Sequence, residues 1–210
     1  MPLLQEKEYY TYADFLEWDE DFRAEIIDGE VYEMSPPLLE HQRISRKLLI
    51  KFDTFLEGKS CEVFAAPVRV RLFPTEDRRD DTVLQPDLIV VCDASKLDER
   101  GCNGAPDLVI EILSPSNTTR EQLLKFNRYL EAGVREYWVV EPEYRFVQVN
   151  ILDIEPKVRE PKVRGRYVTS VYGISDPKEA DPPRYASDVV PVTVLPGLSI
   201  DLKTIFRARD

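Results

Sequence analysis

Two carboxylates stand where an apolar strand pattern calls for hydrophobic side chains. Asp87 begins the apolar run 87–91, and Glu111 lies late in the apolar run 107–113. Both runs are rich in β-branched residues, as is typical of strands that are buried on both faces. Removing an ionised carboxylate from water costs roughly several kcal/mol even after relaxation. The pair therefore favours a shared compensating charge, most simply a divalent metal ion, in a catalytic arrangement.

The size and composition of the chain indicate a globular protein. Its 210 residues are 43% hydrophobic, which is enough to bury a core and favours a single domain over residues 1–210. No segment approaches the roughly 18 to 20 consecutive apolar residues of a membrane span, and residues 1–8 lack the basic and apolar regions of a signal peptide. We therefore expect a cytoplasmic protein with no membrane partner.

The cysteines and the single histidine limit the metal chemistry. Three cysteines are an odd number, they form no Cys-x-x-Cys pair, and His41 is the only histidine. Such a set supports neither a disulfide framework nor a zinc site. We expect Cys61, Cys92 and Cys102 to be reduced thiols.

The net charge is unfavourable for binding a polyanion. The sequence has 28 Lys and Arg residues against 39 Asp and Glu residues, which gives −11 and opposes non-specific attraction to nucleic acid. Basic residues near the two acidic strands in sequence could still form a local basic rim. The alternative is an ordinary solvated surface of mixed charge. The candidate residues are Arg69, Arg71, Arg78, Arg79, Arg120, Lys125, Arg128 and Arg135.

The elements that must position these groups alternate between helices and strands. Helical spacing, capping residues and the Asp28-Gly29 turn signal mark most of the boundaries. The pattern predicts helices over 11–18, 38–58 and 118–132, a hairpin over 24–34, and strands over 63–73, 135–140 and 145–152. This order predicts an α/β fold with a mixed α+β sheet.

The helix over 118–132 presents two different faces. Apolar and polar side chains separate at helical spacing, so we expect the apolar face to pack against the sheet. The apolar face holds Leu123, Phe126 and Leu130, and the other holds Gln122, Lys125 and Tyr129.

The segment 153–191 differs from the rest of the chain. It contains a tandem duplication, 155–159 followed by 160–164, and several more prolines. Such a composition predicts an extended excursion rather than core. Residues 192–202 are then expected to return to the sheet and to lead into a short terminal helix.

A series of short motifs resembles one family across most of the chain. With these motifs the chain resembles the Uma-type restriction endonuclease family of the PD-(D/E)XK nuclease superfamily. The motifs are Glu25-Ile26-Ile27-Asp28-Gly29-Glu30, Met34-Ser35-Pro36, His41, Gln85-Pro86-Asp87-Leu88, residues 106–116, Lys125, Tyr129, Gly133-Val134-Arg135-Glu136-Tyr137-Trp138 and Leu195-Pro196-Gly197-Leu198.

The resemblance implies a restriction-endonuclease-like core, a central mixed sheet flanked by helices, and an endonuclease that hydrolyses phosphodiester bonds in DNA. Mg²⁺ or Mn²⁺ would stabilise the charge that develops on phosphate oxygens and would lower the pKa of a bound water. The resemblance implies Asp87, Glu111 and the carbonyl of Ile112 as ligands, with Glu25 completing the acidic cluster. Without it, Glu25 would be interpreted as an exposed residue beside a tight turn.

The chain departs from the superfamily pattern at one position. The lysine that usually stands two residues after the second acid is replaced by Leu113. The resemblance moves the amine to the following helix, at Lys125, where it would position or activate the attacking water. The alternative is a surface ion pair between Glu121 and Lys125, which would contribute about 0.3 kcal/mol.

Three further residues are candidates for contact with substrate. They are His41, Gln85 and Tyr129. His41 could also act as a general base or cap its helix. A serine hydrolase that combines His41 with Ser114 or Ser116 is disfavoured, because neither serine lies in a Gly-x-Ser-x-Gly elbow and no acid is evident to orient the imidazole.

Two classes of function follow from these observations. The first is the metal-dependent endonuclease, which by analogy would act as a homodimer, since two sites related by a two-fold axis can cut both strands. The second is a non-catalytic binding or assembly module on the same scaffold, favoured by Leu113 and by the acidic surface.

Overall fold

The computed structural model describes residues 8–19, 22–154, 165–175 and 184–207. A mixed sheet of six strands forms its centre, in the order β12-β11-β10-β9-β6-β3. Only β9 and β10 run parallel, and the other neighbours are antiparallel. This confirms the predicted mixed-sheet fold. The strands are β3 (Glu62–Ala65), β6 (Leu88–Val91), β9 (Leu108–Ile112), β10 (Glu136–Glu141), β11 (Phe146–Ile154) and β12 (Gly165–Gly173).

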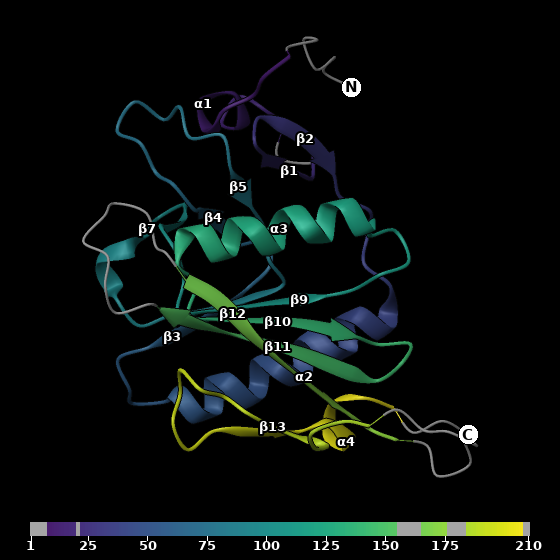
Figure 1. Cartoon of the computed structure of the whole chain (residues 1–210). Helices are drawn as coiled ribbons and strands as arrows, with labels where there is room; N and C mark the ends of the chain where they lie inside the picture. The colour runs from purple at the N-terminus through teal and green to yellow at the C-terminus, as the bar shows by residue number, and fades with distance from the viewer. Residues whose placement is uncertain (1–7, 20–21, 155–164, 176–183, 208–210) are drawn as a thin grey trace.

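Two long helices cover opposite faces of this sheet, α2 (Leu39–Leu56) and α3 (Thr119–Ala132) (Figure 1). Both match the predicted helices. The Thr118 side chain accepts a hydrogen bond from the Glu121 backbone N–H at the start of α3, and Gly133 ends the helix in the left-handed conformation. None of the helices in the described ranges is long and apolar enough to cross a membrane.

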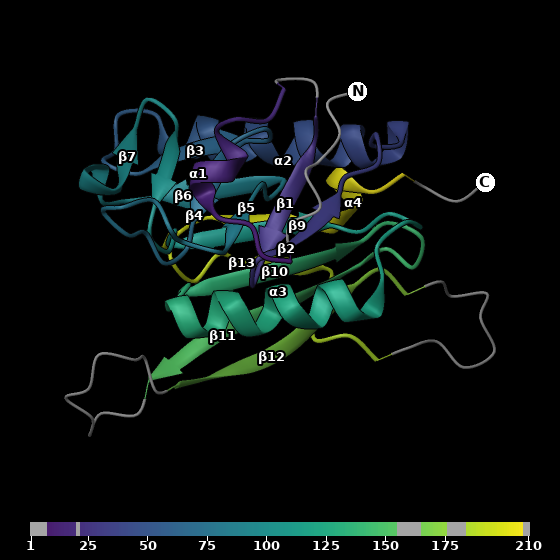
Figure 2. The same ribbon diagram turned by 90° about the horizontal axis from the view of Figure 1, so that it is seen from above.

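A second six-stranded sheet, in the order β2-β1-β5-β4-β8-β7, lies on the α3 side of the molecule (Figures 1 and 2). The predicted hairpin is confirmed, and its turn residues Asp28 and Gly29 both have positive φ. The strands are β1 (Ala24–Ile27), β2 (Glu30–Glu33), β4 (Arg69–Arg71), β5 (Val83–Leu84), β7 (Leu97–Asp98) and β8 (Gly101–Asn103), and α1 (Tyr12–Phe15) and a 3₁₀ turn (Ala94–Lys96) accompany them.

The single strand predicted over 63–73 is two strands in different sheets. The chain leaves the central sheet after β3, passes through Ala66 and Pro67, and enters the second sheet at β4. Proline has no backbone N–H to donate to a ladder, which is why a strand readily ends beside it.

The C-terminal part of the chain also departs from the prediction. Residues 165–173 are not an excursion, because β12 pairs with β11 along nine residues of the central sheet. Residues 192–202 do not return to that sheet. Instead β13 (Val189–Pro191) and β14 (Ser199–Asp201) form a separate pair, followed by α4 (Leu202–Ile205) beside α2. The tandem duplication 155–164 lies outside the described residues.

The buried face of α3 differs in part from the predicted one. Phe126 of the predicted face packs against Tyr137 and Tyr167, as expected. Lys125 and Tyr129 are buried, whereas the Leu123 side chain is 60% exposed. Tyr129 packs against Tyr137 of β10, with ring centroids 4.9 Å apart. Helical periodicity alone does not show this, because polar partners elsewhere in the chain determine that Lys125 and Tyr129 are buried.

The expectation of three reduced thiols is wrong for two of them. Cys61 and Cys92 form a disulfide, and Cys102 is a buried free cysteine. The cause is the antiparallel register of β3 and β6, in which Glu62 lies opposite Val91, so that the next opposed pair is Cys61 and Cys92. Sequence spacing alone does not reveal that register.

The buried carboxylate of Glu136 supports the α2 side of the sheet. It accepts hydrogen bonds from Trp138 Nε1 and from the Val194 backbone N–H, each at 2.8 Å, and it is fully buried. Replacing Glu136 with Leu leaves both donors unpaired, so we expect a loss of about 2 to 4 kcal/mol in unfolding free energy, measured by urea denaturation. Glu62→Leu at an exposed position is the control. Equal unfolding free energies of the two variants would contradict a stabilising role for the buried hydrogen bonds of Glu136.

Candidate active site

Asp87 and Glu111 lie on one face of the central sheet. Leu88 pairs with Ile110 in the antiparallel ladder of β6 and β9, so the next pair along the ladder is Asp87 and Glu111. Along each strand, Ile89 and Val109 belong to the α3-side core, and alternation puts both carboxylates on that same face. Directly opposed residues have Cβ atoms about 4.5 to 5.5 Å apart. Asp87 and Glu111 are therefore neighbours on one face of the sheet, where one cation could contact both.

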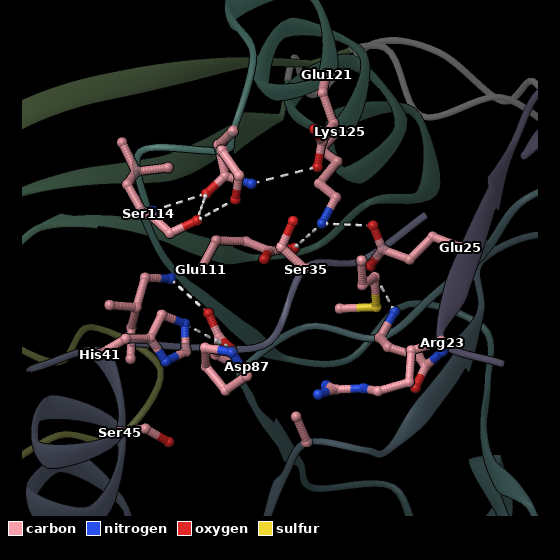
Figure 3. Close-up of a pocket in the computed structure, with 18 of the residues that line it drawn as sticks. Arg23, Glu25, Ser35, His41, Ser45, Asp87, Glu111, Ser114, Glu121 and Lys125 are labelled. Atoms are coloured by element: carbon pink, nitrogen blue, oxygen red, sulfur yellow. Dashed lines mark hydrogen bonds and ion pairs between the residues drawn. The ribbon is translucent and has the colours of Figure 1, made fainter. Parts of the chain in front are cut away.

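The Asp87 carboxylate is held by two different elements. Its Oδ2 accepts a hydrogen bond of 2.7 Å from the Ile112 backbone N–H on the neighbouring strand. Its Oδ1 lies 3.1 Å from His41 Nε2, on the first turn of α2. Figure 3 shows the imidazole and the carboxylate facing each other at the edge of the cleft. His41 therefore orients Asp87.

Lys125 is inserted between the buried carboxylate of Glu25 and the partly buried carboxylate of Glu111. Its Nζ lies 2.7 Å from Glu25 Oε2 and donates a hydrogen bond of 3.2 Å to Glu111 Oε1. The hydroxyl of Tyr129, one turn further along α3, donates to the same Glu111 oxygen at 2.7 Å. Lys125 is 6% exposed, so the alternative of a surface pair with Glu121 is wrong. The amine reaches back toward the cleft (Figure 3).

Glu25 comes from the second sheet and is also buried. Its Oε1 accepts a hydrogen bond of 2.7 Å from the Gln85 backbone N–H, and the Gln85 side chain donates to the Ala24 carbonyl at 2.9 Å. The alternative of an exposed residue beside a turn is therefore wrong. Gln85 attaches β1 to the strand that leads to Asp87, so it brings Glu25 to the other acids.

Burial and mutual repulsion shift the ionisation of this cluster. Burial raises the pKa of Glu111 to about 7, with Glu25 and Asp87 adding to the rise and Lys125 opposing it. Burial alone would lower the pKa of Lys125, but Glu111 and Glu25 raise it above its ordinary value. The amine is therefore protonated at neutral pH. It can supply positive charge and hydrogen bonds, and it is not a free base.

These groups line one cleft of about 640 Å³. It brings together Glu25, His41, Gln85, Asp87, Glu111, Ile112 and Lys125, all singled out from the sequence. Tyr129 is fully buried beneath it, so its predicted contact with substrate is wrong, and the hydroxyl orients Glu111 instead. Gln85 lines the cleft, but its side-chain amide is bonded to backbone.

The predicted basic rim is not present at the cleft. Of its eight residues only Lys125 lines the cleft, and several others are paired elsewhere: Arg71 with Asp80, Arg120 with Glu30, Arg128 with Asp28 and Arg135 with Asp107. Sequence reasoning missed the arginines that do line it, Arg23 and Arg46. Arg23 stands two residues before Glu25, and Arg46 lies one helical turn and a residue beyond His41. The closeness of each arginine to a predicted site residue could have been recognised from the sequence.

The turn between β9 and α3 was also missed as part of the cleft wall. The Ser114 backbone N–H donates to Asn117 Oδ1 at 2.8 Å, and the Ser114 and Ser116 hydroxyls lie 2.7 Å apart. Ser114, Ser116 and Asn117 all line the cleft, and Figure 3 shows Ser114 there. They add neutral donors and acceptors on the side opposite Glu25.

The donor set fits a hard divalent cation that retains water. Nowhere in the described ranges do three His, Cys, Asp or Glu side chains form a ready metal site. A cation would instead be held by Asp87, Glu111 and the Ile112 carbonyl, with water completing its shell, as Mg²⁺ is often bound. Glu111 Oε1 accepts the hydrogen bonds of both Lys125 and Tyr129. The other oxygen, Oε2, therefore stays available to bind a metal ion.

Comparisons with known proteins bear on the family and on the fold. The model of the Uma2 family, described as "Putative restriction endonuclease", matches residues 12–174. The chain is 30% identical to the uncharacterised protein slr1290 of Synechocystis sp. over 118 residues, which are 55% of this chain and 60% of that protein's length. A crystal structure from Anabaena variabilis, described as a "putative nuclease belonging to DUF820", superposes with a TM-score of 0.66 at 22% identity. It covers 94% of this chain and 97% of that one, and supports the fold.

Proposed function

The chain belongs to the Uma2 family, and on this premise we propose that it is a metal-dependent endonuclease that hydrolyses phosphodiester bonds in DNA. The observation that carries the proposal is the opposition of Asp87 and Glu111 on one sheet face, with the Lys125 amine bonded to Glu111. Two carboxylates that can hold a metal ion and an amine beside them are groups that suit metal-dependent phosphodiester hydrolysis.

The protein groups have separable tasks in this proposal. Mg²⁺ or Mn²⁺, held by Asp87, Glu111 and the Ile112 carbonyl, would stabilise charge on the phosphate and lower the pKa of water. Lys125, protonated between Glu25 and Glu111, offers its charge and hydrogen bonds to the attacking water rather than accepting a proton. Tyr129 and His41 fix the orientation of the carboxylates.

The binding-module alternative loses part of its basis in this geometry. It rested on Leu113 in place of the usual lysine and on the acidic surface. Lys125 brings an amine to the same acid from the following helix. Uptake of Mn²⁺ through Asp87 and Glu111 separates the two functions, since a binding module has no need of it.

The serine hydrolase is also disfavoured, although for a different reason than the sequence suggested. An acid does orient the imidazole, since Asp87 lies 3.1 Å from His41 Nε2. However, no serine hydroxyl hydrogen-bonds to His41 within the described ranges, and the Ser114 hydroxyl is bonded to Ser116 and Asn117. The serine therefore has no base to activate it.

Mn²⁺ affinity should rise with pH as Glu111 ionises. A metal ligand must lose its proton, and the Glu111 pKa of about 7 means that protons compete with the metal below neutral pH. We expect apparent affinity to be about tenfold weaker at pH 6 than at pH 8, by titration calorimetry. His41→Ala removes the imidazole that contacts Asp87 and should keep this dependence. A dependence that vanishes in His41→Ala would contradict the assignment to Glu111.

A nicking assay tests the proposed function itself. Purified protein should convert supercoiled plasmid to open-circular and linear forms with Mg²⁺ or Mn²⁺, and EDTA should stop it. Asp87→Ala, purified in parallel, excludes a contaminating nuclease. Absence of any cleavage with either metal across pH 6 to 9 would contradict the proposal.

A further inference from the structure

The charges that line the cleft do not balance. Five carboxylates face three Lys or Arg side chains there. Lys125 is already bonded to Glu25 and Glu111, so it cannot also attract a distant phosphate. The remaining cations of the cleft are Arg23 and Arg46.

Both arginines are exposed, and within the part of the chain that the structure describes neither guanidinium forms an ion pair or hydrogen bond. This differs from Arg120, Arg128 and Arg135, which are bound to carboxylates. An exposed arginine with no acidic partner beside a cleft of carboxylates retains its full capacity to bind an anion.

The two arginines come from opposite walls of the cleft. Arg23 precedes Glu25 by two residues, which in an extended chain separates their Cα atoms by about 7 Å. Arg46 follows His41 by five residues, or about 7.5 Å along the axis of α2. In Figure 3, Arg23 and Glu25 lie on one side, His41 and Ser45 of α2 lie on the other, and Asp87 and Glu111 lie between them.

We propose that Arg23 and Arg46 bind the phosphates on either side of the scissile phosphate, so that the substrate is a polynucleotide strand that spans the cleft. This inference rests on the proposed function. Each offset is large enough to bring an arginine to a flanking phosphate rather than to the scissile one, since a DNA strand carries one charge per roughly 3.4 Å of helix axis. Arginine suits the task, because its planar fork binds a phosphate through two hydrogen bonds and stays charged at any working pH.

DNA binding tests this inference without relying on catalysis. The probe is a fluorescein-labelled 20-base-pair duplex, and its anisotropy is measured in Ca²⁺ over a range of salt concentrations. Arg23→Ala and Arg46→Ala should each weaken binding about tenfold and each reduce the slope of log affinity against log salt by about 0.9, the value for one lost phosphate contact. Arg100→Ala, at an exposed arginine outside the cleft, is the matched control. Affinities and slopes equal to those of wild type would overturn the inference.

A comparison of substrates distinguishes this inference from the proposed function. Bis(4-nitrophenyl) phosphate has a single phosphodiester and no flanking phosphates. Each arginine variant should lose at least about tenfold more activity on the duplex than on this small ester. Equal losses on both substrates would overturn the flanking-phosphate assignment. A wild-type protein that cleaves neither substrate would contradict the proposed function, and the binding experiment would still decide the role of the arginines.

Discussion

Replacing Glu111 with Ala is expected to abolish both Mn²⁺ binding and DNA cleavage. The side chain supplies one of two carboxylate ligands, and metal-ion stabilisation of a phosphate transition state is worth several kcal/mol, so cleavage should fall by about 10³-fold or more. Asp87→Ala should have the same effect, because it removes the opposing ligand. Titration calorimetry with Mn²⁺ and a plasmid-nicking time course measure the two losses.

Neither variant should unfold the protein. Removing either carboxylate relieves repulsion within the acidic cluster, which offsets part of the lost packing. Asp53→Ala, at an exposed position on α2, is the matched control and should keep metal binding and cleavage. An Asp87→Ala or Glu111→Ala protein that is folded, binds no Mn²⁺ and yet cleaves DNA at the wild-type rate would exclude these residues as the catalytic metal ligands.

Replacing Lys125 with Ala should separate catalysis from metal binding. The amine donates to Glu111 and competes with a cation for that carboxylate, so Mn²⁺ binding should be kept or slightly strengthened. Cleavage should fall by about two orders of magnitude, as is typical when one positioned group at the reacting atoms is lost. The same titration and nicking assay report both effects.

Loss of Lys125 also leaves Glu25 and Glu111 buried without their counter-ion, which can cost about 3 to 5 kcal/mol of stability. We therefore expect Mn²⁺ to raise the melting temperature of Lys125→Ala more than that of wild type. Lys125→Gln, which keeps a hydrogen-bond donor, is a second variant in case the first fails to fold. Lys51→Ala on α2 is the control. Cleavage that both Lys125 variants leave intact would assign the amine a structural role only.

Local signals in the sequence were sufficient to predict the two acidic strands and the two long helices. Asp87 and Glu111 interrupt apolar runs, and Thr118 and Gly133 bound α3 through hydrogen bonds to the nearby backbone. Each of these features depends on residues within a few positions. The pairing of β6 with β9 places the two acids opposite each other. The family resemblance implies this pairing, and no local sequence pattern predicts it.

The features that were predicted wrongly depend on distant partners. Tyr129 and Lys125 are buried because Glu111 and Glu25 lie on other strands, so the periodicity of α3 could not show which face packs. The disulfide of Cys61 and Cys92 follows from strand register, which the spacing of cysteines does not contain. The homodimer and the cytoplasmic location stay predictions.

The most direct test of the central claim is an anomalous difference map from a crystal soaked in Mn²⁺. We expect a peak between Asp87 and Glu111, with ligand oxygens of both carboxylates and of the Ile112 carbonyl about 2.0 to 2.6 Å away. The peak should be absent from crystals of Glu111→Ala. A fully occupied Mn²⁺ elsewhere with none at this site, or a peak that Glu111→Ala retains, would contradict a metal-dependent site built on these two carboxylates.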